Sequence, residues 1–142
     1  MRFDLDMVCE RCSEVGLACV RRAPEEVAVQ LEPDVTLLFQ NAPDEDDNLI
    51  GFEGTPWHSH DGLMCVDSHG IYVELNYLDL VSGLADGTVL ICESWVRGAI
   101  EDRWLVPRDF VDECRHMKDG EEIRIRPVGS RNREDSTENR GA

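Results

Sequence analysis

The chain has 142 residues, of which 42% are hydrophobic, and this is enough to bury the core of a single domain. Its 30 acidic and 14 basic residues give a formal net charge of −16 at pH 7, which disfavours binding to nucleic acids and to anionic membranes. No apolar run approaches the roughly 20 residues that a membrane-spanning helix needs.

The first predicted element is a short helix over about residues 5–15. Apolar residues recur there at spacings of three and four, Asp4 is a suitable N-cap, and Gly16 is a suitable end. Cys9 and Cys12 form a Cys-x-x-Cys motif on this helix, a motif that can bind zinc or carry out redox chemistry. No second such motif accompanies it. The alternative is therefore a structural helix with Cys12 facing inward and Cys9 half-exposed.

Strands dominate the next part of the chain. Three β-rich segments follow the helix, at residues 18–22, 27–31 and 35–40. Residues 41–48 are predicted to form a solvated loop, because Pro43 is followed by four acidic residues. A β-hairpin is predicted over residues 63–75, around a turn at residues 67–70.

The second half is predicted to combine two further helices with a long hairpin. The predicted elements are a helix over 76–87, hairpin strands over 88–96 and 99–106, a helix over 107–117 and a strand over 122–128. Asn76 is a suitable N-cap for the first of these helices, and Arg97-Gly98 is a tight turn between the strands.

The order of these elements predicts the fold class. Short turns rather than crossover helices join the strands, which is typical of an α+β fold with a mainly antiparallel sheet, here with about three short helices. Residues 1–128 are predicted to form one α+β domain. Residues 129–142 are predicted to be a disordered polar tail, because the end of the chain has almost no apolar residues.

The N-terminal sequence and the cysteines predict a compartment. The sequence MRFDLDMVCERC has acidic residues where a secretion signal would be apolar, so we expect a cytoplasmic protein with reduced thiols. Cys19, Cys65 and Cys92 lie in apolar runs and are expected to be buried as small hydrophobic side chains.

The acidic charge is concentrated in the middle of the sequence. Between Ala23 and Val96 there are 15 Asp and Glu residues and no Lys or Arg. Because a surface of one sign attracts partners of the other, we expect this region to bind a basic protein. The alternative is that the acidity only keeps the protein soluble. The predicted partner-binding residues are Asp44, Glu45, Asp46, Asp47 and Glu53, with Trp57 as an aromatic anchor.

The sequence TPWHSHDG, residues 55–62, contains two of the four histidines. If this segment is extended, His58 and His60 point to the same side and can chelate zinc or another transition metal, with His69 as the third ligand. Other candidate third ligands are Asp61, Cys65, Asp67 and Glu74. One alternative is that Trp57 packs while the histidines hydrogen-bond to the loop backbone. Another is a catalytic histidine oriented by a carboxylate.

Other catalytic motifs are absent from the sequence. It contains no nucleophile elbow, no phosphate-binding glycine loop and no dinucleotide fingerprint.

In the strand over 99–106, Asp102 and Arg103 face opposite sides, so they do not pair with each other. Arg103 is expected to pair with Glu74 or Glu93 on another strand.

Two segments, GTPWHSHDGLM and VLICESWVRGAIEDRWLVPRDFVDE, resemble a pattern seen in small uncharacterised bacterial proteins. In that pattern a Pro-Trp-His-x-His loop precedes an Asp-Arg-Trp-Leu hairpin, and the resemblance covers about residues 50–126. It implies no particular activity and no catalytic residue. In size, acidity and lack of catalytic motifs, the chain is also similar to immunity proteins of bacterial toxin systems. That similarity implies binding to a cognate toxin, often a basic nuclease, whose active site is blocked.

These observations leave three functional hypotheses. The leading one is an acidic cytoplasmic protein that binds a basic protein, most concretely an immunity protein that neutralises a toxin. The second is a small metal-binding protein or metal-dependent enzyme centred on His58, His60 and His69. The third is a structural or scaffold domain.

Overall fold

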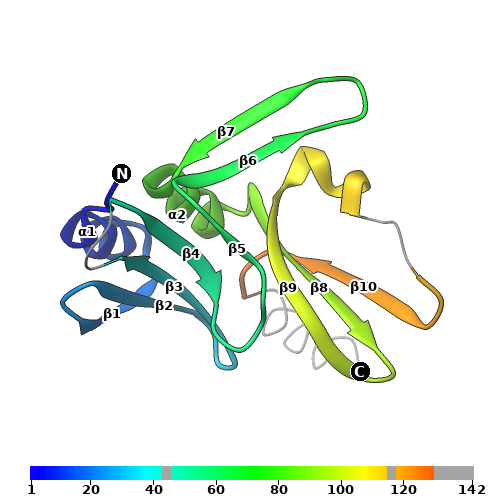
Figure 1. Ribbon diagram of the computed structural model, residues 1–142, viewed down its shortest axis with the longest axis horizontal. Helices are drawn as coiled ribbons and strands as arrows, with labels where there is room; N and C mark the ends of the chain where they lie inside the picture. Colours follow the sequence, from blue (N-terminus) through cyan, green and yellow to red (C-terminus); the bar gives the residue numbers. More distant parts are fainter. Residues whose placement is uncertain (43–45, 115–117, 130–142) are drawn as a thin grey trace, which may run out of the picture.

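The computed structural model describes residues 1–42, 46–114 and 118–129 (Figure 1). In chain order the elements are α1 (Leu5–Val15), β1 (Ala18–Ala23), β2 (Glu26–Glu32), β3 (Val35–Asn41), β4 (Asn48–Phe52), β5 (His58–Ser59), β6 (Gly62–Val66), β7 (Tyr72–Asn76), α2 (Tyr77–Asp86), β8 (Val89–Val96), β9 (Ala99–Pro107), the 3-10 helix η1 (Arg108–Cys114) and β10 (Glu121–Arg126).

The strands form two sheets and a separate hairpin, and every pair is antiparallel. The first sheet has the order β1-β2-β3-β4-β5, the second has the order β10-β8-β9, and β6 pairs only with β7. The predicted α+β class with mainly antiparallel strands is confirmed. β4 and β5 were not predicted, because the segment NLIGF is short, begins with Asn and does not alternate between apolar and polar residues.

Both α-helices begin and end close to where their capping residues predict. The Asp4 carboxylate accepts a hydrogen bond from Met7 N at 3.2 Å, and α1 ends at Gly16, whose φ of 82° is left-handed. The Asn76 side chain caps α2 by accepting from the backbone N–H groups of the next turn. None of the helices in the described part of the chain is long and apolar enough to cross a membrane.

The prediction of a third α-helix over residues 107–117 is wrong. Pro107 is the last residue of β9, where it pairs with Val89, instead of opening a helix. The N–H of Arg108 then donates to Thr88 O at 2.8 Å, so β-type pairing continues past the proline. The seven residues of η1 follow, which is short for a stable α-helix, and they adopt the tighter 3-10 geometry. Residues 115–117 lie outside the described part of the chain.

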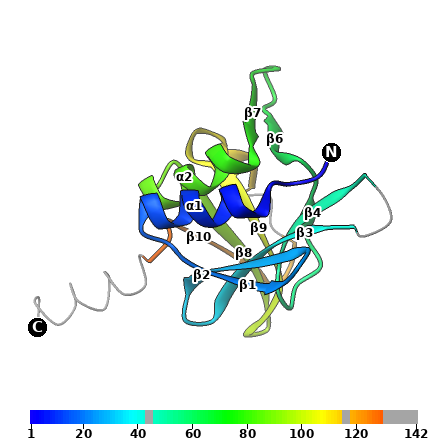
Figure 2. The same ribbon diagram turned by 90° about the vertical axis from the view of Figure 1, so that its left-hand side faces the viewer.

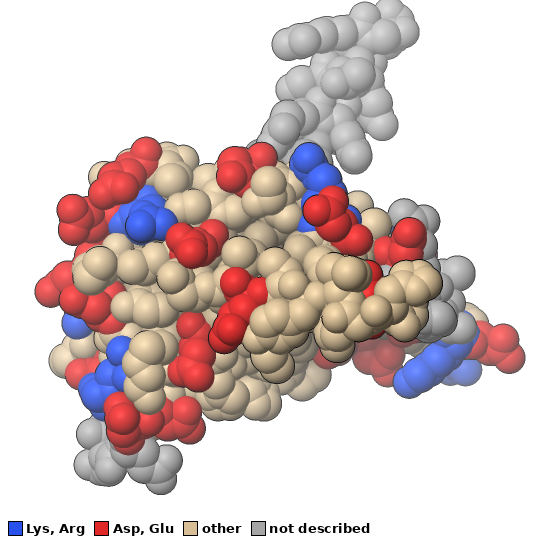
Figure 3. Space-filling view, turned by 90° about the horizontal axis from the view of Figure 1, so that it is seen from above, with Lys and Arg blue, Asp and Glu red and all other residues tan. Residues whose placement is uncertain are grey.

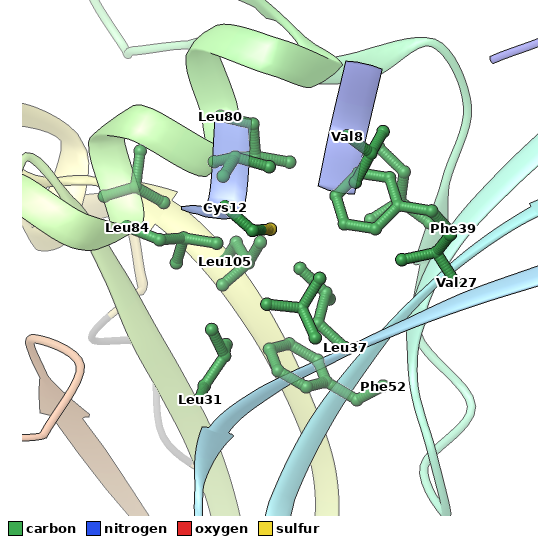
Figure 4. Packing of buried hydrophobic residues seen from close by; sticks show 14 of the residues in the cluster. Val8, Cys12, Val27, Leu31, Leu37, Phe39, Phe52, Leu80, Leu84 and Leu105 are labelled. Atoms are coloured by element: carbon green, nitrogen blue, oxygen red, sulfur yellow. The ribbon is translucent and has the colours of Figure 1, made fainter. Parts of the chain in front are cut away.

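One large core lies between the two sheets and the two helices. α1 and α2 lie side by side across the strands (Figure 2), and side chains from both helices and from both sheets point toward one another (Figure 4). The labelled residues in that view are Val8, Cys12, Val27, Leu31, Leu37, Phe39, Phe52, Leu80, Leu84 and Leu105. A smaller apolar cluster lies beneath η1, where Phe110 packs against Cys92 and Val106. The prediction that residues 1–128 form one domain stays a prediction, and residues 130–142 of the predicted tail lie outside the described part.

A buried ion-pair network, formed by Glu32, Glu93, Arg103 and Arg126, joins the two sheets. The Glu93 side chain is fully buried, and its Oε2 lies 2.7 Å from both Nε and a terminal nitrogen of Arg103. The Arg126 guanidinium is 2.7 Å from Glu93 on β8 and 2.7 Å from Glu32 on β2. The expected pairing of Arg103 with Glu93 is confirmed. The network ties the last strand to both sheets.

The network keeps Glu93 ionised although it is buried. Burial raises the pKa of this carboxyl, but hydrogen bonds from Arg126, Arg103 and the Trp95 indole outweigh burial and lower the pKa to about 2. For Arg126, burial lowers the pKa and hydrogen bonds to Glu32 and Glu93 raise it, with a net rise above the ordinary value. Glu93 and Arg126 therefore carry their charges inside the core.

Candidate protein-binding surface

The segment TPWHSHDG supplies β5, which pairs with β4 at the edge of the first sheet. The side chains of His58 and His60 are exposed, and their ring centroids lie 5.4 Å apart with the rings nearly perpendicular. The prediction that the two histidines lie on the same side is confirmed.

Both imidazole rings contact carbonyl groups of the local backbone. His60 Nδ1 donates to Asn48 O, and His58 Nδ1 lies 3.4 Å from Pro56 O. Because a carbonyl oxygen only accepts, Nδ1 carries the hydrogen in these contacts and Nε2 is the acceptor of the neutral ring. His58 thus contacts its own loop, as in the alternative, whereas His60 contacts the backbone of β4.

The structure does not bring the third predicted metal ligand to this pair. His69 lies in the turn of the β6–β7 hairpin, whose tip projects away from the body and from β5 in Figure 1, and its N–H donates to Asp67 Oδ1. In the part of the chain that is described, no three His, Cys, Asp or Glu side chains are grouped so that they hold a metal ion. The metal site formed by His58, His60 and His69 stays a prediction.

Trp57 is held partly inside the protein. The indole ring packs on Phe52 with 6.0 Å between the ring centroids. The backbone N–H of Trp57 donates to Asp102 Oδ1 at 3.0 Å. The indole is half-buried and belongs to the margin of the large core. Only part of this side chain is therefore available as the predicted anchor for a partner.

The predicted partner-binding acids are only partly placed. Asp44 and Glu45 lie outside the described residues. Asp46 is exposed and lies 3.5 Å from the N-terminal amino group, and Asp47 lies 3.4 Å from Nδ1 of His60. The segment around residues 46–47 therefore adjoins the histidine loop.

Glu53 is occupied by a cation of the same chain. Its carboxylate lies 2.9 Å from the Arg22 guanidinium. The hydrogen bond between them lowers the pKa of Glu53 and raises that of Arg22. Because both side chains are exposed, a partner can still displace this pair, but Glu53 contributes less free negative charge than the sequence predicted.

Two adjoining hollows flank His60, and the sequence analysis missed them. The first hollow has a volume of about 430 Å³ and the second about 570 Å³. Six acidic residues line them: Glu25, Glu26 and Asp47 in the first, and Asp61, Glu74 and Asp79 in the second. The described residues that line the two hollows include no Lys or Arg. His60 lines both and so forms the ridge between them.

Two of these acids are near a cation that lies outside the lining. Glu25 binds the Arg2 guanidinium, and Asp79 is 3.8 Å from a terminal nitrogen of Arg11. A further positive charge, the N-terminal amino group, belongs to Met1, which lines the second hollow. The negative charge of the hollows is thus reduced but not cancelled.

Glu26, Asp61 and Glu74 are held by neutral donors instead. The donors are Gln40 Nε2 at 2.5 Å, Asn48 Nδ2 at 2.7 Å and Tyr72 Oη at 2.8 Å. None of the three acids forms a salt bridge with a described residue. These carboxylates are oriented by the fold toward the hollows that they line.

The thiols form a cluster of their own on the other side of the core. Cys19 Sγ donates to Cys9 Sγ at 3.1 Å, and Cys12 is buried beside them. Burial raises the pKa of Cys12 to about 11 and also raises the pKa of Cys19. Cys9, Cys12 and Cys19 are free thiols. Cys92 is buried as predicted, whereas Cys19 and Cys65 are only partly buried.

We expect Cys12 to resist alkylation in the folded protein. A pKa of about 11 instead of 9 leaves about a hundredfold less thiolate at neutral pH, and burial also excludes the reagent. Peptide mass spectrometry after timed iodoacetamide treatment measures the rate at each cysteine, and the same reaction in concentrated urea is the control. If Cys12 reacts equally fast in both, the inward-facing side of α1 is assigned wrongly.

Comparisons of this chain with protein families, with curated proteins and with solved structures gave no match.

Proposed function

We propose that this chain is a protein-binding protein that engages a basic partner through the two hollows on either side of His60. The observation that supports this function best is the composition of the lining, with six acidic residues and no Lys or Arg among the described residues. Concave surfaces lined by one sign of charge focus the electrostatic field and raise the association rate of oppositely charged partners.

The most concrete form of the proposal is an immunity protein that covers the active site of a basic toxin in the cytoplasm. Acidic side chains on an inhibitor couple strongly to a basic site when the charges are close. Here the carboxylates of Glu26, Asp61 and Glu74 are fixed by hydrogen bonds, so little side-chain freedom is lost when a lysine or arginine enters. The His60 ring lines both hollows and so adds a polar group between these carboxylates.

Replacing these three acids by amides tests the role of the hollows. We expect the triple variant Glu26→Gln/Asp61→Asn/Glu74→Gln to bind an octalysine peptide about tenfold more weakly than the parent chain, because three nearby charges are removed. Isothermal titration at low and at high salt measures the affinity, and salt is expected to weaken the parent complex more than that of the variant.

The matched control changes the same net charge elsewhere on the surface. Glu10, Glu101 and Asp119 are exposed and do not line either hollow, so their triple amide variant is expected to lose much less affinity. Equal losses in both triple variants would show that the peptide responds only to the total charge, and the proposed role of the hollows would be abandoned.

A further inference from the structure

The β6–β7 hairpin exposes large apolar side chains to solvent. Met64 is 67% exposed, Val66 and Ile71 are each 61% exposed, and Tyr72 is 54% exposed. The described part of the chain exposes seven large hydrophobic residues, and these four lie within nine positions of one another. Such a concentration on a projecting element marks an interaction site, because monomeric surfaces normally expose such residues singly.

The pairing of the two strands places three of these residues on one face, while Ile71 lies just before β7. Met64 lies opposite Glu74 and Val66 lies opposite Tyr72, so these two pairs project from the same side of the ribbon. The alternate residues of both strands pack inward against the two apolar clusters; they are Leu63, Cys65, Val73 and Leu75. A hairpin with one buried face normally presents polar residues on the other, whereas here Met64, Val66 and Tyr72 accompany Glu74 on the outer face.

We propose that the outer face of β6–β7 and the second hollow together form a docking surface for a cationic protein segment that carries apolar side chains. This inference rests on the proposed function and names the chemistry of its partner. Met64 and Glu74 belong both to the hairpin face and to the lining of the second hollow, so the apolar and acidic parts are continuous. The Tyr72 hydroxyl donates to Glu74 and joins the two parts directly.

The charge around the hairpin favours one kind of binding partner over the others. Figure 3 looks down on this side of the molecule, where a broad tan surface is bordered by many acidic side chains. A second copy of the chain would bring Glu74, Asp61 and Asp79 against identical acids on a molecule of net charge −16. An anionic membrane is disfavoured for the same reason. A segment with alternating lysine and apolar residues satisfies both parts of the surface.

The inference is tested with two defined peptides on the full chain. One is an eight-residue peptide of alternating lysine and leucine, and the other has serine in place of leucine. The parent chain is expected to bind the leucine peptide about tenfold more tightly, since a few buried apolar side chains contribute most of the energy of such contacts. The double variant Met64→Ser/Val66→Ser is expected to bind both peptides equally.

The matched control is the double variant Met7→Ser/Val20→Ser. It removes the same pair of residue types from exposed positions on α1 and β1, where Met7 is 44% and Val20 is 62% exposed. This control is expected to keep the full preference for the leucine peptide. Nuclear magnetic resonance shifts on adding the leucine peptide should concentrate in β6, β7 and the second hollow.

Each other result overturns the inference in a distinct way. If the hairpin variant keeps the preference while the acidic triple variant loses binding, this inference fails and the proposed function stands. If neither peptide binds the parent chain, both fail together. If sedimentation shows a dimer of the parent chain that the hairpin variant does not form, the occupant is a second copy and the cationic partner is wrong.

Discussion

A Glu93→Gln protein is expected to unfold with a free energy about 3–5 kcal/mol lower than that of the parent chain. The substitution keeps the shape of the side chain but removes the negative charge that neutralises Arg103 and Arg126. Arg103 is only 6% exposed, so its guanidinium cannot regain full hydration, and Glu32 is left as the single carboxylate of the network. Urea unfolding followed by circular dichroism measures the difference.

The control for this substitution is Glu122→Gln on the adjacent strand. Glu122 also forms an ion pair with an arginine, Arg124, but both side chains are exposed to water. The urea concentration at the unfolding midpoint of Glu122→Gln is expected to stay within error of the parent value. Adding Arg103→Met to Glu93→Gln removes one unpaired cation and should recover part of the lost stability. If Glu93→Gln behaves like Glu122→Gln, the network contributes little to stability.

The same carboxyl makes the stability depend on pH in a defined window. The pKa of Glu93 falls from 4.5 to about 2 on folding. Below pH 4.5 this carboxyl therefore binds a proton in the unfolded chain but stays ionised in the folded protein. The stabilisation is therefore fully present above pH 4.5 and is lost as the pH falls toward 2. The slope of stability against pH in this window should be smaller in Glu93→Gln, where this group no longer titrates.

A Gly62→Ala protein is expected to lose about 3 kcal/mol of stability and to bind the lysine–leucine peptide poorly. A Cβ at residue 62 would lie 2.0 Å from Leu75 O and 3.0 Å from the Cα of Asn76, both in the backbone of the paired strand. Backbone atoms cannot swing aside as a flexible side chain does. The base of the hairpin must open, and this displaces the strands that carry the docking surface.

Gly70 at the other end of the same hairpin is the control. Its φ of 80° is unfavourable for alanine, but a Cβ there meets no atom within 4 Å. Gly70→Ala should cost only about 1 kcal/mol and leave peptide binding unchanged. Urea unfolding and the peptide titration separate the two variants. A Gly62→Ala protein as stable as Gly70→Ala would contradict the close approach of the two strands.

Local signals predicted the elements that local chemistry determines. Asp4 and Asn76 cap their helices, and the turn at residues 67–70 closes the predicted hairpin. The helix predicted over residues 107–117 failed because the apolar spacing is equally compatible with a 3-10 helix. In the structure the N–H of Arg108 donates to Thr88 O, just before β8, and such a contact depends on tertiary structure.

Less of the candidate site than of the fold could be predicted from the sequence. The placement of His58 and His60 on the same side was predicted from strand alternation, although only His58 and Ser59 belong to β5. The hollows were not, because Glu26 on β2, Asp61 just before β6 and Glu74 on β7 lie 35 and 13 positions apart in the sequence and come to line neighbouring hollows only in the folded chain. The sequence showed the excess of acidic charge but not which carboxylates share a concave surface.

The position of Arg126 in the chain also bears on how the protein is made. During synthesis Glu32 and Glu93 leave the ribosome long before the strand that carries Arg126, the cation that both glutamates share. Until β10 emerges, closing the two sheets over these carboxylates would bury negative charge without its counterion. We therefore expect the two sheets to close over these carboxylates only once β10 is available, so that a chain cut before Arg126 does not form the native core.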